Sequence, residues 1–208
     1  MQVELSEIGK RFGRNWVFKN VNWKFNSGDC CSITGPNGSG KSTILKIISG
    51  FGLPDKGIVH YHLHNRLINS SDVYKEISIV APYLFLIDSY TIYEQLMFQE
   101  KFKPYVRGMD SKEVLQVLDM DTVSDKCIRD CSTGMKQRIK LALAILSSSS
   151  LLLLDEPASN LDEQGVRWYH ELLKNYRNDR TLLICTNNPT LDGMQFDDNL
   201  TIDRFKPA

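Results

Sequence analysis

The sequence predicts an α/β fold, in which parallel strands alternate with helices around a buried sheet. Two short apolar runs, 151–154 and 181–186, have the length and composition of strands buried on both faces. A segment with helical spacing, 163–176, separates them, and this strand–helix–strand order is typical of a parallel sheet. A glycine-rich turn follows a further strand-like segment, 31–34, and precedes the helical spacing of 42–49.

The remaining elements fall into two groups along the chain. The first eighty residues predict short strands bounded by glycine- and asparagine-containing turns, at 3–5, 21–25, 57–64 and 77–81. From about residue 90 the periodicity becomes helical, at 91–103, 111–118 and 133–147. The middle third is therefore expected to be a helical insertion in the α/β core.

Length and charge narrow the class of protein. The 208 residues predict a single domain over 1–208, with a helical subdomain at about 84–132. Lysine plus arginine number 25 and aspartate plus glutamate number 25, so charge gives no reason to expect a nucleic-acid partner. No run approaches the roughly 20 apolar residues that cross a bilayer, and the first residues lack the apolar segment of a signal peptide. We therefore expect a soluble, cytoplasmic chain.

Residues 35–42, Gly-Pro-Asn-Gly-Ser-Gly-Lys-Ser, fit the phosphate-binding pattern G-x-x-x-x-G-K-[ST] between a predicted strand and a predicted helix. Glycines permit the backbone angles that turn successive N–H groups towards phosphate oxygens, and the helix directs its positive end at the same anion. We expect Lys41 to reach the β- and γ-phosphates and the Ser42 hydroxyl to bind Mg²⁺. The predicted nucleotide site consists of Gly35, Pro36, Asn37, Gly38, Ser39, Gly40, Lys41, Ser42 and Thr43.

Two carboxylates, Asp155 and Glu156, follow the buried run 151–154. They therefore lie at the carboxyl edge of the predicted sheet, where ligands bind in folds of this kind. We expect Asp155 to hold Mg²⁺, through water, and Glu156 to polarise the attacking water as general base. Together with the phosphate-binding pattern, this pair predicts a nucleotide hydrolase.

Residues 131–138, Cys-Ser-Thr-Gly-Met-Lys-Gln-Arg, resemble the LSGGQ signature of the ABC ATPase family. Ser132 and Gly134 match the signature, whereas Cys131, Thr133 and Met135 are substitutions. The segment lies between the phosphate-binding pattern and the carboxylate pair, as it does in the family. A serine at the start of a helix is also a good N-cap, so a purely structural role for Ser132 remains the alternative.

Other segments resemble the same family, over nearly the whole chain. Residues 157–162 resemble the D-loop, and the resemblance implies that Asp162 crosses to a partner subunit. Phe12 lies where family members keep an aromatic that stacks on adenine; Trp16 is the rival, and a hairpin or core role for Phe12 stays open. The resemblance implies a P-loop NTPase (RecA-like) core with an N-terminal antiparallel β subdomain and a helical signature subdomain.

The resemblance also implies ligands and partners. In the family, two such domains pair head to tail around two ATP molecules, and each signature faces the γ-phosphate held by the other subunit. We therefore expect ATP and Mg²⁺, a second ATPase subunit that is identical or different, and a separate transmembrane permease. The chain would lie on the inner face of the membrane, and the compact length is similar to the ATPase subunits of small bacterial exporters, including the haem-exporter type. The expected docking surface, or alternatively an internal aromatic core, contains Tyr83, Phe85, Tyr90, Tyr93 and Phe98.

Two positions depart from the family pattern. Pro82 stands in place of the Q-loop glutamine that follows the strand 77–81, and proline offers no side-chain hydrogen bond. Asn187 stands in place of the switch histidine; its amide can still bond a γ-phosphate oxygen but cannot carry a positive charge. Because Lys41, Asp155 and Glu156 are retained, we expect a slow ATPase in which Asn187 still takes a catalytic role.

Two other functions compete with a transporter ATPase. A non-transport ABC ATPase acting on DNA or ribosomes usually has tandem ATPase domains, long coiled coils or zinc modules, and none is visible in this sequence. A regulatory ATP-binding module with little hydrolysis is favoured by Pro82 and Asn187 and opposed by Glu156.

Overall fold

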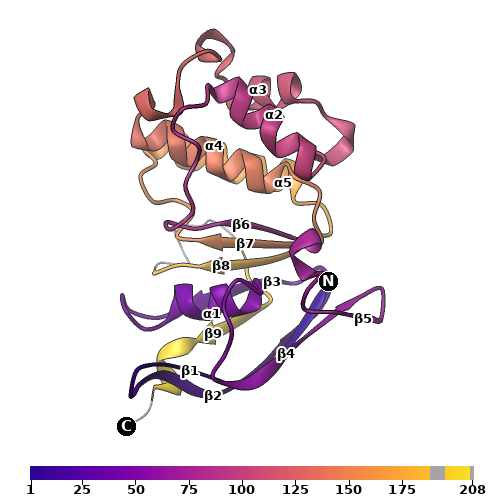
Figure 1. Ribbon diagram of the computed structural model, residues 1–208, viewed down its shortest axis with the longest axis vertical. Helices are drawn as coiled ribbons and strands as arrows, with labels where there is room; N and C mark the ends of the chain where they lie inside the picture. Colours follow the sequence, from indigo (N-terminus) through magenta and orange to yellow (C-terminus); the bar gives the residue numbers. More distant parts are fainter. Residues whose placement is uncertain (188–194, 207–208) are drawn as a thin grey trace. The chain divides into compact units, whose positions relative to one another are not determined.

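A computed structural model describes residues 1–187 and 195–206, which fall into two compact units. The first unit contains Met1–Ala81, Ser149–Glu156 and the described residues from Asp179 onwards. The second contains Pro82–Ser148 and Pro157–Asn178. The first unit holds two β-sheets and helix α1, and the second is helical (Figure 1).

A parallel sheet forms the centre of the first unit. Its strands run in the order β6-β7-β8-β3-β9, and each neighbouring pair is parallel. All residues of β7 and β8 are buried, which explains their uninterrupted apolar sequences. Helix α1 (Lys41–Ile48) packs against β7 and β8. The strands are β3 (Cys30–Thr34), β6 (Ile77–Val80), β7 (Leu151–Asp155), β8 (Thr181–Cys185) and β9 (Asp198–Thr201).

An antiparallel sheet completes the first unit, in the order β2-β1-β4-β5. Its buried side chains join one apolar core with residues of the parallel sheet and of α1; Phe18, Ile33 and Leu45 are fully buried members. The strands are β1 (Gln2–Phe12), β2 (Asn15–Phe25), β4 (Lys56–Leu63) and β5 (Arg66–Ile68). The predicted α/β core with an N-terminal antiparallel sheet is thus confirmed.

The N-terminal strands are longer than the sequence pattern predicts. Strands β1 and β2 each contain 11 residues, because pairing continues across register shifts between Leu5 and Arg11. Glu7, inside this stretch, has a φ of 53°, which breaks the strict alternation of buried and exposed side chains. Strands β5 and β9 were not predicted, because one has three residues and the other is largely polar.

The second unit contains α2 (Ile92–Phe102), α3 (Ser111–Leu118), α4 (Thr133–Ile145) and α5 (Glu163–Tyr176). A polar side chain caps the start of each: Thr91, Asp110, Ser132 and Asp162 accept hydrogen bonds from backbone N–H groups of the first turn. Short 3₁₀ turns are η1 (Val73–Glu76), η2 (Val106–Gly108), η3 (Asp121–Val123), η4 (Ile128–Asp130) and η5 (Ile202–Phe205).

The helical unit includes α4 and α5 in addition to the segment 84–132, whose delimitation as a subdomain stays a prediction. Among residues 1–187 and 195–206, the structure has no helix with the length and apolar character that crossing a membrane requires.

Candidate active site

The phosphate-binding pattern forms a loop between β3 and α1. Gly35, Gly38 and Gly40 have φ angles of 152°, 75° and 107°, which L side chains rarely adopt. At Gly40 space is also limiting, because a Cβ there would lie 2.8 Å from Cγ1 of Val17 on β2. Glycine is therefore required where the chain turns into the helix, as expected of a loop that presents backbone N–H groups to an anion.

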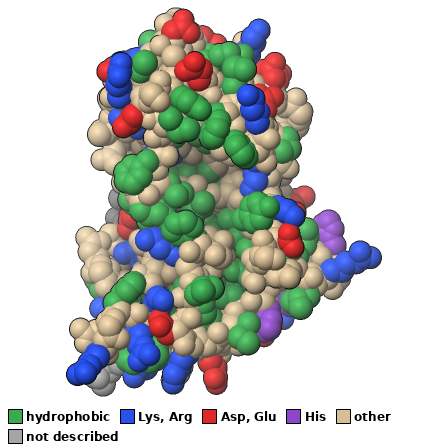
Figure 2. Space-filling view, viewed as in Figure 1, with side chains coloured by type: hydrophobic (Ala, Val, Ile, Leu, Met, Phe, Trp, Pro, Cys, Tyr) green, Lys and Arg blue, Asp and Glu red, His purple; other side chains and the backbone are tan. Residues whose placement is uncertain are grey.

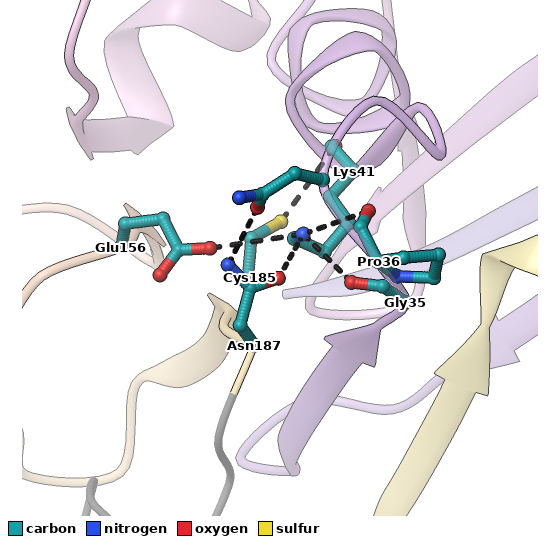
Figure 3. Close-up of polar contacts among 7 residues, drawn as sticks. Gly35, Pro36, Lys41, Glu156, Cys185 and Asn187 are labelled. Atoms are coloured by element: carbon teal, nitrogen blue, oxygen red, sulfur yellow. Dashed lines mark hydrogen bonds and ion pairs between the residues drawn. The ribbon is translucent and has the colours of Figure 1, made fainter.

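Lys41 lies at the centre of this site, with 6% of its surface exposed. Its Nζ donates to the carbonyl oxygens of Gly35 at 2.8 Å and Pro36 at 3.3 Å, and to Oδ1 of Asn187 at 2.5 Å (Figure 3). Oε1 of Glu156 lies 3.7 Å from the same nitrogen. The structure thus brings together three predicted catalytic residues from α1, the end of β7 and the segment after β8; their roles stay predictions.

Asp155 ends β7 and is 1% exposed. Neither of its carboxylate oxygens has a hydrogen-bond partner in the described part of the chain. Burial raises the pKa of Asp155, and the Ser42 hydroxyl and the Lys41 ammonium oppose this shift. Buried carboxylate oxygens without a partner are rare, and oxygen is the ligand type that Mg²⁺ prefers. Asp155 and Ser42 therefore fit a magnesium site.

The raised pKa of Asp155 gives a testable pH dependence. The folded state retains the proton at a pH where the unfolded chain has lost it, so the free energy of unfolding falls as pH rises above the ordinary carboxylate range. Without nucleotide, Asp155→Asn is expected to raise that free energy at pH 8 by about 1–3 kcal/mol, because burying a neutral amide costs less than burying a carboxylate charge. Urea unfolding at pH 5 and pH 8 measures it.

The same substitution should remove the dependence of nucleotide affinity on Mg²⁺. Asp121→Asn, at an exposed carboxylate in the second unit, is the matched control and should change neither quantity. A nucleotide-free Asp155→Asn protein that is less stable than the wild type at pH 8 would contradict this account of the site.

Glu156, the first residue after β7, has a φ of 49°. A residue other than glycine in this region is strained, and such strain concentrates at functional sites. Its N–H donates to the carbonyl oxygen of Cys185 at 2.9 Å, which ties it to the end of β8. Burial raises the pKa of Glu156 and Lys41 opposes the shift. A carboxylate whose pKa is raised towards neutrality is better suited to act as a general base.

The structure adds contacts that the sequence did not predict. Nδ2 of Asn187 donates to Oδ1 of Asn37 at 2.7 Å, across a sequence separation of 150 residues (Figure 3). Sγ of Cys185 lies 3.7 Å from the carbonyl oxygen of Lys41, joining β8 to the start of α1. No short-range pattern marks these pairs, because each joins residues more than 140 positions apart.

Phe12 and Trp16 lie on either side of the turn between β1 and β2. Phe12 is 64% exposed, with Nζ of Lys10 5.8 Å from its ring centroid. Trp16 is half-buried, and its ring is approached by Arg11, Lys19 and Lys56 at 5.5, 4.9 and 5.7 Å. The more exposed ring of Phe12 is better placed to accept a base, so Phe12 remains the predicted stacking residue.

The signature and D-loop segments meet inside the second unit. Oγ of Ser132 accepts from the N–H of Met135 at 3.2 Å, and Oδ1 of Asp162 accepts from the N–H of Gly165 at 2.7 Å. A Cβ on Gly134 would lie 3.2 Å from the carbonyl oxygen of Asn160. A cavity of about 270 Å³ opens between the two segments, lined by Ser132, Gly134, Met135, Arg138, Asn160, Leu161, Asp162, Gln164 and Gly165.

Two residues in this region were not predicted as site residues. Gln137 is 7% exposed, and its Nε2 donates to the carbonyl oxygen of Pro157 at 2.8 Å, which fixes the start of the D-loop to α4. Arg138 donates to the carbonyl oxygen of Leu118 at 2.6 Å and lies 4.7 Å from the ring centroid of Trp168. The polar run 136–138, directly after the signature, was the sequence feature that could have pointed to these two residues.

The two departures from the family pattern are also located. Pro82 is exposed and is the first residue of the second unit, directly after β6 and Ala81. Asn187 is the last residue described before 188, so the rest of the segment that follows β8, including Pro189, lies outside the described residues.

Comparison with known proteins places these features in a family. Residues 18–159 match the model of the family described as ABC transporter. The chain is 32% identical over 184 residues to the sulfate/thiosulfate import ATP-binding protein CysA of Pectobacterium atrosepticum, covering 83% of this chain and 55% of that protein. It therefore spans about half the length of the curated CysA relatives it matches. It is also 26% identical to the lantibiotic transport ATP-binding protein SrtF of Streptococcus pyogenes, covering 89% and 80% of the two chains.

Solved structures agree with this assignment. A dimeric ATP-binding cassette in a post-hydrolysis state, bound to ADP and Pi, superimposes with a TM-score of 0.80 at 25% identity, covering 97% of this chain and 95% of that one. A bacterial Atm1-family ABC exporter with ATP bound has the same fold, with a TM-score of 0.80 at 18% identity over 97% of this chain and 37% of that one. The chain therefore belongs to the ABC transporter family, as its sequence motifs predicted.

Proposed function

We propose that this chain is the ATP-binding and ATP-hydrolysing subunit of an ABC transporter. The observation that supports this function most directly is the contact between Lys41 and Glu156, next in sequence to the buried Asp155, whose carboxylate has no hydrogen-bond partner among residues 1–187 and 195–206. A glycine-rich loop at the start of a helix, a buried ammonium and two carboxylates are the groups that phosphoryl transfer to water requires. The relatives named as import and transport ATP-binding proteins support the same activity.

Each residue has a distinct part in this proposed reaction. The loop from Gly35 to Gly40 binds the phosphates through its backbone, and the ammonium of Lys41 neutralises their charge. The carboxylate of Glu156 accepts a proton from the attacking water, and Lys41 keeps the pKa of Glu156 from rising further. The side-chain amide of Asn187 lies beside the γ-phosphate and can donate a hydrogen bond to it, but it adds no charge.

Asp155 and Ser42 would hold Mg²⁺. The ion supplies charge neutralisation at the phosphate oxygens. The chain's own contribution is a buried carboxylate that makes no hydrogen bond within the described part of the chain and has the Ser42 hydroxyl near enough to lower its pKa, which leaves its oxygens available as ligands or as acceptors for coordinated water. Phe12, exposed at the end of β1, stacks on the adenine ring.

A second ATPase subunit completes the site. Ser132 and Gly134 lie in the helical unit, at the start of α4 and beside the open cavity, and they present their backbone and hydroxyl groups to the nucleotide of the partner. Asp162, at the end of the D-loop, is held in place because its Oδ1 accepts from the N–H of Gly165 and so caps the start of α5. Closure of two such subunits excludes water and strengthens the charge interactions of each site.

The transmembrane permease is proposed to dock on the aromatic segment of the helical unit. Phe85 is 86% exposed. The ring of Phe98 contacts those of Tyr90 and Phe102 edge to face within the unit, although Phe102 itself is 73% exposed. Some of the aromatics therefore pack internally, and Phe85 is the best candidate for a contact with another protein. Figure 2 shows further hydrophobic side chains on one face of this unit. Docking there would place the chain on the cytoplasmic face of a membrane.

Release of phosphate from MgATP by the purified chain tests the proposed activity. Slow release that depends on ATP and Mg²⁺ supports it. Binding of ATP with no release, even at high protein concentration where subunits can pair, would favour a regulatory ATP-binding module. Failure to bind ATP would contradict both functions.

Asn187→His is expected to raise the turnover of the assembled complex by about 10- to 100-fold. The amide cannot carry a charge, whereas a histidine can donate a charged hydrogen bond to the γ-phosphate, and a preorganised donor of this kind is commonly worth about 10²–10³ in rate. Steady-state phosphate release between pH 6 and pH 8 measures it, with Asn199→His, on β9, as control. Unchanged turnover would show that position 187 does not limit the reaction.

A further inference from the structure

We propose that the side-chain amides of Asn37 and Asn187 form a clasp across the phosphate loop, which nucleotide must open before Lys41 can bind its phosphates. The inference rests on the proposed function, because it concerns how ATP enters the same site. It makes Asn37 a positioning residue that acts through Asn187.

The ammonium of Lys41 makes three hydrogen bonds within the protein. An ammonium has three N–H donors, and in this structure Nζ of Lys41 donates to the carbonyl oxygens of Gly35 and Pro36 and to Oδ1 of Asn187. All three donors are therefore used within the protein. An incoming phosphate oxygen can bind Lys41 only by replacing one of these acceptors.

The side-chain amide of Asn187 makes a hydrogen bond at each of its two ends. Oδ1 accepts from Lys41 at 2.5 Å, and Nδ2 donates to Oδ1 of Asn37 at 2.7 Å (Figure 3). The opposite orientation of the amide would place an NH₂ group against an ammonium, so the charge of Lys41 fixes which end faces it. Asn37 then holds the other end, and a single amide bridges the loop and the lysine.

Of the three acceptors of Lys41, the side chain of Asn187 can move away most easily. The carbonyl groups of Gly35 and Pro36 are backbone, held by the conformation of the loop. Asn37 and Asn187 are both exposed side chains, so water can satisfy their amides once they separate. Rotation of these two side chains is therefore the least costly way to free one donor of Lys41. The clasp stabilises the nucleotide-free loop and weakens nucleotide binding by the same amount.

Asn37→Ala tests the clasp. Loss of one solvent-exposed hydrogen bond is expected to tighten binding of a fluorescent MgATP analogue by about two- to fivefold, mainly through faster association. In an Asn187→Ala background, where the clasp is already absent, the added Asn37→Ala change should leave the affinity unchanged. Asn22→Ala is the matched control, since its exposed amide bonds the backbone of Glu7 on the outer sheet.

A second readout does not involve nucleotide. Hydrogen exchange of the backbone amides of Gly35 and of residues 37–40 in the nucleotide-free protein should be faster in Asn37→Ala than in the wild type and unchanged in Asn22→Ala. Unchanged or weaker nucleotide binding by Asn37→Ala, or additive effects in the double variant, would overturn the clasp. Absence of ATP binding by the wild type would instead overturn the proposed function, so the two failures are distinguishable.

Discussion

Glu156→Gln is expected to lower the rate of phosphate release by about 10²- to 10⁴-fold while leaving ATP binding within about threefold of the wild type. The glutamine has the same shape, and its amide oxygen can face Nζ of Lys41 as Oε1 of Glu156 does at 3.7 Å, so the binding loop keeps its arrangement. It cannot take a proton from water at neutral pH. Single-turnover phosphate release and equilibrium nucleotide binding, measured on the same preparation, separate the two effects.

Glu163→Gln is the matched control for this substitution. Glu163 lies in the first turn of α5, and its side chain is 94% exposed beside Arg167. It should keep wild-type turnover. Turnover by Glu156→Gln within tenfold of the wild type would mean that another group accepts the proton and that the strained carboxylate after β7 has a different role.

Lys41→Ala is expected to weaken ATP binding by about 10²- to 10³-fold. Removing one partner from a buried, hydrogen-bonded charge pair costs about 2–5 kcal/mol in binding, partly because the phosphates then lack a countercharge. Lys41 is 6% exposed, so water cannot replace the ammonium fully. Titration with a fluorescent nucleotide, with and without Mg²⁺, measures the loss.

Lys24→Ala, at an exposed lysine of β2, controls for the general loss of a positive charge. It should bind ATP as the wild type does. Thermal unfolding of both variants without nucleotide checks that they remain folded. Retention of affinity within fivefold by a folded Lys41→Ala protein would contradict the placement of the phosphates beside this residue.

The sequence predicted the central sheet well because its strands are buried on both faces. Such strands are short continuous apolar runs, and β7 and β8 match the predicted runs to within one residue at each end. Glycine spacing located the phosphate loop for a different reason. The positive φ angles at Gly38 and Gly40 favour glycine, and at Gly40 the side chain of Val17 also excludes a Cβ, so local residue types are enough to predict this backbone conformation.

Pairing between distant segments was harder to predict. The edge strand β9 is polar, and only its parallel pairing with β3 reveals it as part of the sheet. The register shifts in β1 interrupt the alternation of apolar and polar residues, so the sequence pattern predicts a shorter strand than the one observed. The helical spacing of α2 to α5 and their polar caps are local features, which is why these four helices matched the predicted segments closely.

The candidate site divides in the same way. Residue types and spacing identified Lys41, Asp155 and Glu156 individually, because each belongs to a local motif. The contact of Asn187 with Asn37 and Lys41 depends on how β8 and the loop after β3 lie in three dimensions, and no local pattern encodes it. The burial of Asp155, whose carboxylate has no hydrogen-bond partner in the part of the chain that the structure describes, is likewise a property of packing.

Capture of the membrane partner tests the central claim most directly. Tagged Glu156→Gln protein, incubated with MgATP, would be isolated from detergent-solubilised membranes of cells that make this chain, and the bound proteins identified by mass spectrometry. The same capture with ADP is the control. We expect a multi-pass membrane protein, recovered together with a second ATPase subunit when ATP is present. Ribosomal or DNA-bound proteins without any membrane subunit would contradict a transporter ATPase and the docking surface around Phe85.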